Sequence, residues 1–518
     1  MYLDMLITPP LAVDYIVVIV VLLWLVYLVY RRIRANAVLP PGPVGYPIIG
    51  NVLDMMVNEI WVAAQEWGKR YGGLLYLRGF GQSIVIINSY EIAVDLLERR
   101  SLKYSDRPNS VMLNELQGWD WMFANLPYGD HWKRKRNPLQ RFLESSNAAH
   151  HEQILKSEVQ KLMRQLIHSP RDFYSDIRRS MASIIMMLTY GHEVLSLDDQ
   201  FVDLADKCID QLALALRPGA YLVDALPLLK YLPKWFPGAG FQMAAEKGKK
   251  LSHDMQYVPY VDARNKTLSG KAVRSFTSQR IEYCIGVNGE LSRLDEETIS
   301  SAAGVCYMAG VDTSTSMIQC FILAMTLFPE AQRRAQEEID RVVGSDRLPQ
   351  LSDRPQLPYC AALCKELLRW QPVSPLGLAH ASKEDDEFDG YYIPAKSTII
   401  ANQWAMLRDP VEYPEPSAFR PERFLPSAGG RIQRDPSKIA FGFGRRVCPG
   451  KHFAESTMFL AVCQTLAVFS ISKIKDEEGN IMEPVVEFAL DGVVHHPSPF
   501  DCDIIPRSKE AASLIQWD

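Results

Sequence analysis

The sequence predicts a mainly α-helical fold with small β-sheets, an α+β class, and three observations support this prediction. Long stretches of the chain, of which 241–267 and 295–327 are examples, carry apolar residues at helical spacing. Strand-like alternation is confined to short stretches such as 74–89. The chain has 518 residues, of which 47% are hydrophobic, and this is enough for a large core. Length alone allows one large domain or two to three smaller ones.

The expected elements follow one another without internal repeats. Residues 61–71 have helical spacing, 74–89 form a hairpin that turns at Gly79-Phe80-Gly81, and 91–100 return to a helix. The segment 105–121 is irregular. The further helices are expected, in order, from 132 onward, in two stretches of 152–190, and over 198–216, 241–267, 295–327, 329–343, 358–370 and 453–469, with short strands at 391–393 and 397–402.

Charge and cysteine content exclude two classes of protein. Lys plus Arg number 56 and Asp plus Glu number 61, so the net charge is −5 and no nucleic-acid partner is expected. The nine cysteines are scattered and contain no C-x-x-C pair. This pattern favours a reducing compartment over a disulfide framework.

An apolar stretch near the start of the chain predicts a single membrane anchor. Residues 11–30 are apolar apart from Asp14, and twenty helical residues span about 30 Å, the thickness of the hydrocarbon core. Arg31, Arg32 and Arg34 follow at once. Because basic residues stay on the cytoplasmic side, the rest of the chain is expected to face the cytoplasm.

A cleaved signal peptide is the alternative for this stretch, since Ala35-Asn36-Ala37 has the form of a cleavage site. The long apolar run and the basic residues on its far side argue against it. Asn265-Lys266-Thr267 is an acceptor pattern for N-glycosylation, and a glycan there would overturn the cytoplasmic orientation. The chain is thus divided into a short N-terminal segment (1–10), an anchor (11–30), a basic and proline-rich hinge (31–43) and a large body (44–518).

The body is organised around residues 441–450, F-G-F-G-R-R-V-C-P-G. A proline and an apolar run follow Cys448, so the cysteine is expected at the start of a buried helix, where the helix dipole favours a thiolate. Gly444 and Gly450 let the backbone approach a large flat group, and Arg446 is placed to pair with a carboxylate on it. A haem whose iron is held by a thiolate meets all of these needs.

These residues resemble the haem-binding signature of the cytochrome P-450 family, F-x-x-G-x-R-x-C-x-G, and fill each fixed position. The resemblance implies one large, mainly helical domain that binds haem b, with Cys448 as the axial thiolate ligand of the iron. It also places Phe441 and Arg446 against the cofactor. A buried structural cysteine is the alternative.

Two further motifs resemble family sites for the haem propionates. Trp132 and Arg136 fit W-x-x-x-R, and His380 stands where the family has a histidine or arginine. A solvated basic helix and a core histidine are the respective alternatives. The side chains of residues 133–135 (K-R-K) would point partly outward and help to form a basic docking face for an acidic redox partner.

Residues 309–314 (A-G-V-D-T-S) resemble the family motif A-G-x-[DE]-T in the middle of the longest predicted helix. The resemblance implies that Thr313 hydrogen-bonds oxygen at the iron or a water, and that Asp312 feeds protons inward. Such a composition is poor for a helix, so a kink or a widened turn is expected here. The alternative for Thr313 is back-bonding to its own helix. Asp295 is the expected N-cap of this helix.

An architectural cluster is also implied. Glu366 and Arg369 lie three apart on one helix, as in the family's E-x-x-R, and Arg423 lies in the later P-E-R-F stretch. In the family this cluster is buried and holds the chain that leads to the cysteine.

The resemblance implies a haem-thiolate monooxygenase that inserts one atom of O2 into a small lipophilic substrate. Residues 115–121 and 127–129 are similar to fungal secondary-metabolism members, which points to a terpenoid. No nucleotide-binding glycine motif is present, so electrons are expected from a separate NADPH-cytochrome reductase, with cytochrome b5 as a second donor. The expected location is the endoplasmic reticulum membrane.

Two other functions stay open. One is a reductase-independent isomerase or dehydratase of the same family, against which Asp312 and Thr313 argue because it has less need of proton delivery. The other is a non-catalytic haem sensor or binding protein.

Overall fold

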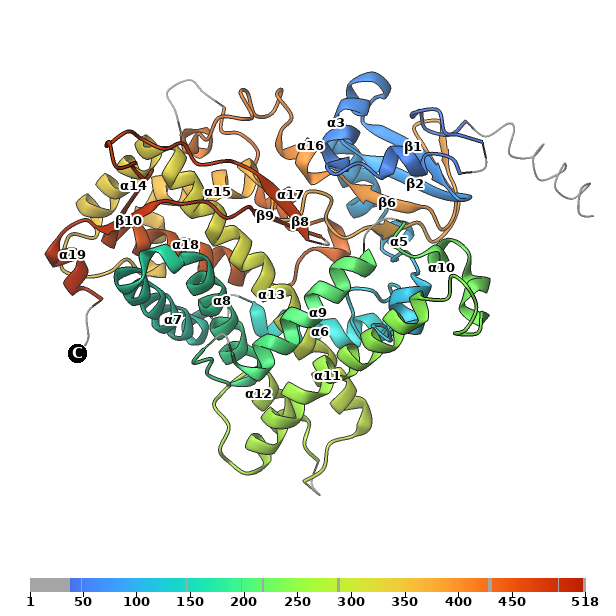
Figure 1. The fold of residues 1–518 in the computed structure, drawn as a ribbon, viewed down its shortest axis with the longest axis horizontal. Coiled ribbons are helices and arrows are strands. Elements are labelled where there is room, and N and C mark those ends of the chain that lie inside the picture. The colour runs from blue at the N-terminus through green and yellow to red at the C-terminus, as the bar shows by residue number, and fades with distance from the viewer. Residues whose placement is uncertain are drawn as a thin grey trace, which may run out of the picture.

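Helix α13 (Arg293–Leu327) runs through the centre of the molecule, and the other elements pack around it (Figure 1). The computed structural model describes residues 38–47, 49–144, 148–196, 198–216, 219–286, 289–426, 431–491 and 493–515. The predicted N-terminal segment and anchor, and most of the hinge, lie outside these residues. Within the described ranges no single helix is long and apolar enough to cross a membrane. The pair α13 and α14 meets that test only when joined, with a bend of 104° between them.

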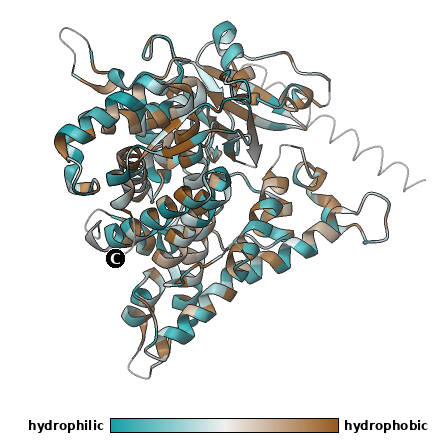
Figure 2. Ribbon diagram, turned by 60° about the vertical axis from the view of Figure 1, so that its left-hand side comes forward, coloured by the Kyte–Doolittle hydropathy of each residue, from teal (hydrophilic) through white to brown (hydrophobic). Residues whose placement is uncertain are grey.

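The chain is mainly helical, as predicted. The α-helices, in chain order, are α2 (Val52–Met55), α3 (Ile60–Tyr71), α4 (Tyr90–Ala93), α5 (Ser101–Tyr104), α6 (Asp130–Leu143), α7 (Ala148–His168), α8 (Phe173–Tyr190), α9 (Gln200–Leu216), α10 (Leu222–Ala225), α11 (Phe241–Leu268), α12 (Phe276–Cys284), α13 (Arg293–Leu327), α14 (Pro329–Val342), α15 (Pro358–Trp370), α16 (Gln403–Leu407), α17 (Ser437–Ala440), α18 (Lys451–Val468) and α19 (Lys509–Ser513). Two π-helical turns, η1 (Val94–Arg99) and η2 (Val111–Leu116), and short 3-10 turns complete them. In Figure 2 the outer helices alternate between teal and brown, as expected of helices that bury one face.

The sheets are small and are spread among the helices across the upper half of the view in Figure 1. The largest has the strand order β1-β2-β6-β3, and the others are two-stranded pairs. Their strands are β1 (Leu74–Gly79), β2 (Gln82–Ile87), β3 (His380–Ala381), β4 (Asp386–Phe388), β5 (Tyr391–Ile393), β6 (Thr398–Ala401), β7 (Phe469–Ser472), β8 (Phe488–Asp491), β9 (Val494–Pro497) and β10 (Asp503–Pro506). Strand β2 pairs in parallel with β6, which joins the first part of the chain to the last third.

The predicted hairpin is confirmed, with Leu74 opposite Ile87 and a two-residue turn at Phe80 and Gly81. Both turn residues have positive φ, 46° and 83°, which matches the twist of the strands they join. The predicted helices lie within a few residues of the observed ones. The N-cap of α13 is different. The hydroxyl of Ser292, three residues before the expected Asp295, accepts from the Asp295 N–H at 3.1 Å.

Helix α13 continues through the A-G-V-D-T-S motif without a change of helical type in any of its described residues, so the predicted widened turn does not occur. Thr313 Oγ1 donates to the Ala309 carbonyl, a contact that adds to the backbone ladder and does not replace it. Gly310 has a packing reason. A Cβ at this position would lie 2.9 Å from Cδ1 of Ile185, so only glycine lets α8 cross this closely.

The predicted architectural cluster is fully buried between α15 and the loop that follows α16. Arg369 donates from Nε to Glu366 Oε2 at 2.7 Å and from Nη2 to Oε1 at 2.8 Å, and Arg423 Nε lies 3.3 Å from Oε1. Both Glu366 and Arg369 are 0% exposed. The remaining guanidinium N–H groups donate to backbone carbonyls of residues 407–418. The cluster therefore fixes the course of the chain ahead of the cysteine loop.

Candidate active site

The loop that carries Cys448 is held by backbone contacts on both sides. The Cys448 N–H donates to the Phe441 carbonyl at 2.8 Å, which closes the loop on itself. Gly444 has φ 55°, and a Cβ there would lie 2.1 Å from the carbonyl oxygen of Leu97. Only glycine is tolerated at such a contact. The sequence motif thus sets a fixed loop that ends at Gly450, the N-cap of α18.

Cys448 has exposed surface although protein surrounds it closely, which is the state of a side chain that faces open space inside the fold. Burial raises the pKa of its thiol, against the lowering effects of the Gly450 N–H and the charges of Arg136 and Lys451. The helix end thus favours the thiolate, as expected, but its effect on the pKa is smaller than that of burial. A bound cation is the group that would stabilise the thiolate.

Four basic side chains gather beside this loop. Arg136 donates from Nη2 to the carbonyl of Val447, next to the cysteine. Arg446 donates to the carbonyls of Ser105 at 2.7 Å and Leu126 at 2.6 Å. The Nδ1–H of His380 donates to the Tyr104 carbonyl at 2.8 Å. The fourth, Arg107, bonds to the carbonyls of Ala124, Leu378 and Ala379.

The indole of Trp132 lies under two of these cations. The Cζ atoms of Arg446 and Arg136 stand 4.7 Å and 5.2 Å from its ring centroid. Its Nε1–H is buried and has no hydrogen-bond acceptor among the described residues. A buried donor without a partner costs free energy, so this N–H points to a missing acceptor.

The cations of this cluster depress one another's pKa values. Burial and the charges of Arg446 and Arg136 lower the pKa of Arg107 to about 9, and burial and Arg136 lower that of Arg446 to about 10. Burial, with Arg107 and Arg446 nearby, lowers the pKa of His380 to about 3.

The basic side chains of this cluster donate their hydrogen bonds to neutral acceptors, which are backbone carbonyls and one side-chain amide. Asp106 is close enough to raise the pKa of Arg446, yet the hydrogen bond that Asp106 accepts comes from the Tyr128 N–H. Within the described residues no carboxylate forms an ion pair or hydrogen bond with this cluster, whose side chains donate to Gln140 Oε1 and to backbone carbonyls. Excess buried positive charge beside a cysteine fits a haem, whose two carboxylates would supply the missing charge.

The two predicted catalytic residues are sequence neighbours with separate partners. Thr313 is partly exposed and its Oγ1 donates to the Ala309 carbonyl at 2.7 Å. This is the back-bonded state that the sequence left as an alternative role. Ala309 is itself exposed although most of α13 is buried, so this face of the helix borders open space.

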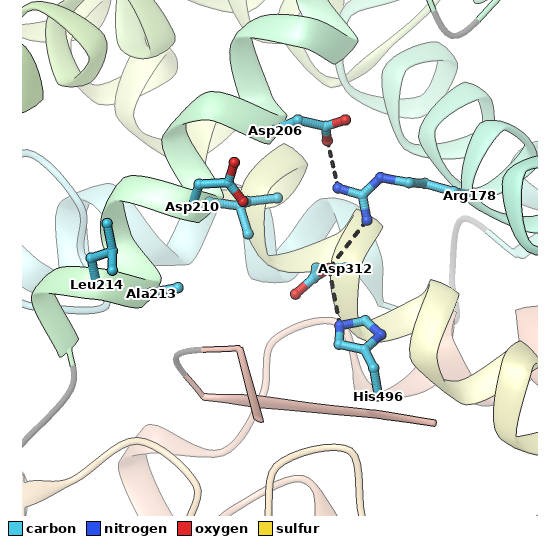
Figure 3. A pocket seen from close by; sticks show the side chains of 8 residues that line it. Arg178, Asp206, Asp210, Ala213, Leu214, Asp312 and His496 are labelled. Carbon is cyan, nitrogen blue, oxygen red and sulfur yellow. Dashed lines mark hydrogen bonds and ion pairs between the residues drawn. The ribbon is translucent and has the colours of Figure 1, made fainter. Parts of the chain in front are cut away.

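Asp312 is buried and accepts at Oδ1 from two other elements. His496 Nε2 of β9 lies at 3.2 Å and Arg178 Nη1 of α8 at 3.4 Å (Figure 3). Burial alone raises the pKa of Asp312, but His496 and Arg178 outweigh it and hold the pKa below its usual value. The carboxyl is therefore a deprotonated acceptor at neutral pH.

The structure thus brings together the side chains of Trp132, Arg136, His380 and Arg446 with the Cys448 loop, and Phe441 closes that loop through its carbonyl. Sequence reasoning missed Arg107, which joins the same cluster. It lies in the irregular segment after Asp106, where no periodicity shows which way a side chain points. Sequence reasoning also missed His496, the partner of Asp312. His495 and His496 do face apart, and no metal-ligand cluster occurs in the described part of the chain.

The expectation for Lys135 is wrong. The helix turns this residue inward, where it is 2% exposed and its Nζ lies 2.9 Å from Glu297 Oε1. Arg134 and Lys133 keep exposed surface.

Comparisons with known proteins show the family of the chain. The family model "Cytochrome P450" matches residues 40–502. "Cytochrome P450 monooxygenase 208" of Postia placenta is 42% identical over 504 residues, 96% of each chain. "Cytochrome P450 monooxygenase 176" of the same fungus is 40% identical, with 95% of each chain covered. "Cytochrome P450 monooxygenase COX2" of Coprinopsis cinerea is 38% identical, with 92% of this chain and 90% of that protein covered. Because the family model and these relatives each span nearly the whole sequence, the chain belongs to the cytochrome P450 family.

Proposed function

We propose that this protein is a haem-thiolate monooxygenase that inserts one oxygen atom from O2 into a small lipophilic substrate. The observation that carries the proposal is the group of half-buried Arg107 and buried Arg136, His380 and Arg446 beside Cys448, which lacks a carboxylate partner among the described residues. The relatives' names, all of monooxygenases, support the reaction class.

The residues of the site divide the work between binding and proton transfer. Arg107, Arg136, Arg446 and the Trp132 N–H would hold the carboxylates of the haem, and Cys448 would bind its iron. When bound, the haem supplies the iron at which O2 is reduced and cleaved. The Thr313 hydroxyl can turn from the Ala309 carbonyl to hold a proton on the face of α13 that borders open space.

A lipophilic substrate and a membrane location are supported by exposed apolar side chains that follow α9 and reach the first turn of α11. These are Leu222, Leu226, Leu228, Tyr231, Trp235, Phe236 and Met243. A hydrogen bond from Gln82 Nε2 to the Asp224 carbonyl ties this segment to the β1–β2 hairpin. Exposed apolar groups this numerous mark a lipid or protein contact. We propose a single-pass protein of the endoplasmic reticulum whose catalytic domain faces the cytoplasm, acting in secondary metabolism on a terpenoid.

A separate NADPH-cytochrome reductase would deliver electrons, with cytochrome b5 as a second donor. The support is a basic surface next to the cysteine loop. Lys133 Nζ stands 5.5 Å from the Tyr128 ring, and Arg445 Nη1 donates to the Tyr128 hydroxyl at 2.7 Å. Exposed Arg134 lies on the same helix as Lys133. Such a patch would attract an acidic partner in a salt-dependent way.

The test is co-expression with a fungal reductase in a microsomal host, followed by product analysis against terpenoid and aromatic substrates. We expect a product that is one oxygen atom heavier and whose formation requires the reductase and NADPH. Turnover that persists without the reductase would replace the proposal with an isomerase or dehydratase. Haem binding with no turnover of any substrate, under conditions in which the reductase reduces the protein, would favour a haem sensor.

A further inference from the structure

The outer side of Asp312 borders a half-open cavity of about 570 Å³ between α8, α9, α13 and β9. Its charged or titratable lining residues are Arg178, Asp206, Asp210, Asp312 and His496, which Figure 3 shows converging from four elements. The cavity lies on the side of Asp312 that faces α8 and α9. The cavity gives water a path to the buried carboxyl of Asp312. This carboxyl belongs to the catalytic motif, and the contacts described so far do not show where its protons come from.

His496 lines the same cavity and contacts the carboxyl directly. Its Nε2 lies 3.2 Å from Asp312 Oδ1, and its Nδ1 lies 3.4 Å from Gln319 Oε1. Gln319 Oε1 can only accept, so the Nδ1–H stays on this amide oxygen and Nε2 is the nitrogen that can gain and release a proton. The neighbouring His495 is turned away and stacks on Phe488, with ring centroids 4.6 Å apart.

Arg178 holds Asp312 only weakly. Its Nη2 lies 2.5 Å from Asp206 Oδ1, whereas its Nη1 lies 3.4 Å from Asp312 Oδ1. The guanidinium is thus paired mainly with the outer acid. Both contacts to Asp312 use Oδ1, and no described residue donates to Oδ2. The carboxyl can accept a proton without first breaking a strong ion pair.

We propose that His496 carries protons from the cavity water to Asp312, and that Arg178, held by Asp206, positions the carboxyl for this transfer. The proposal rests on the proposed monooxygenase function, which consumes two protons for each O2 cleaved. In each step the imidazolium form of His496 gives its Nε2 proton to the Asp312 carboxylate, and Nε2 of the neutral ring then regains a proton from the cavity water, which the solvent resupplies. Asp312 then passes its proton toward the Thr313 side. No electrons move, and the histidine ends each cycle in its starting state.

The test compares His496→Gln with Asp210→Asn. Glutamine can still donate a hydrogen bond to Asp312 but cannot relay a proton. Asp210 lines the same cavity and makes no ion pair within the described residues, so its loss changes the charge of the cavity without touching the relay. With reductase and NADPH, we expect His496→Gln to form product about tenfold more slowly and to release more hydrogen peroxide, with a larger solvent isotope effect. Asp210→Asn should match the wild type.

A second arm separates the relay from the reaction itself. Iodosylbenzene donates an oxygen atom directly and needs no protons from the protein. His496→Gln should therefore keep wild-type product formation with this donor. If its NADPH-driven coupling is also unchanged, or if Asp210→Asn is impaired to the same extent, the relay is wrong. If the wild type forms no product with either oxidant, the monooxygenase function itself fails.

An infrared measurement tests the contact without turnover. The protonated carboxyl band that Asp312→Asn removes should appear at higher pH in His496→Gln than in the wild-type holoprotein, because the variant loses the charge that stabilises the carboxylate. If the band appeared at the same pH in both proteins, His496 would not control the protonation of Asp312. That result would overturn the proposal whatever the kinetics.

Discussion

Arg136 of α6 donates a hydrogen bond from Nη2 to the carbonyl oxygen of Val447, the residue before Cys448. This contact joins the cationic cluster to the loop of the candidate iron ligand. A group bound by the cluster therefore lies beside the thiol of Cys448. A substitution in the cluster is expected to disturb the cysteine loop, and a substitution in the loop to disturb the cluster.

Replacement of Arg446 should weaken haem binding far more than replacement of its neighbour. Arg446→Leu removes a buried charge and leaves the carbonyls of Ser105 and Leu126 without their donor. A hydrogen bond to a charged group contributes about 1.5–3 kcal/mol, so haem affinity should fall at least tenfold. Arg445→Leu is the matched control, because Arg445 is exposed and bonds to Tyr128 and Ser101. Equal haem occupancy of the two purified variants would contradict the assignment of the cluster.

The haem-free protein should lose stability as the pH falls from 7 to 5, in part through His380. Burial, together with Arg107 and Arg446, lowers the pKa of His380 to about 3 in the fold, against about 6.5 when unfolded. Between these values the unfolded chain binds the extra proton, so the free energy of unfolding decreases on acidification, by about 2 kcal/mol from this residue between pH 7 and 5.

His380→Gln, which cannot titrate, should flatten this dependence in urea unfolding. Haem carboxylates would offset the positive charge near His380. In the holoprotein, the pH dependence of the free energy of unfolding should therefore differ less between the wild type and His380→Gln. The same pH slope in wild type and variant would show that His380 is not held neutral in the fold.

Glu366→Ala should prevent stable folding or lower the free energy of unfolding by about 3–5 kcal/mol. The change leaves the buried guanidinium groups of Arg369 and Arg423 without their carboxylate. Glu330→Ala is a control of the same spacing, since Glu330 and Arg333 form an exposed i,i+3 pair whose loss should change stability little. Urea midpoints of the two variants measure the contrast. Similar losses in both would rule out a special role for the buried cluster.

Thr313→Ala should retain haem but divert reducing equivalents to hydrogen peroxide. The control is Thr315→Ala, because Thr315 also donates to the carbonyl four residues earlier, at 2.8 Å, but is fully buried. The ratio of peroxide to NADPH consumed measures the effect, and we expect it to rise several-fold in the first variant alone. Full coupling in Thr313→Ala would leave the hydroxyl with no part in proton transfer.

The sequence was sufficient to predict the class of fold, most helices and the cysteine loop. Apolar periodicity and turn residues act locally, so the hairpin at Phe80-Gly81 and helices such as 329–343 could be located within a few residues. The E-x-x-R cluster was also foreseen, but only through the family resemblance, because a glutamate three residues before an arginine is common on exposed helix faces.

Contacts between distant segments were not predictable. Lys135 looks like a surface lysine by composition, and only the packing of α6 against α13 buries it on Glu297. Arg107 belongs to a segment without periodicity, so its direction depends on the carbonyls of 124 and 378–379 that it meets. His496 is adjacent to His495 in the sequence, and only the course of the strand shows that it turns toward Asp312.

The central claim, that Cys448 is the axial thiolate of a haem iron, is tested most directly by the CO-difference spectrum of the reduced protein. We expect wild type and Cys284→Ser, which changes a half-buried cysteine outside the site, to give the spectrum typical of thiolate ligation. Cys448→Ala should lose that spectrum even where haem remains bound through the cationic cluster. A Cys448→Ala protein that keeps the thiolate spectrum, or a wild type that binds haem without ever showing it, would contradict the account.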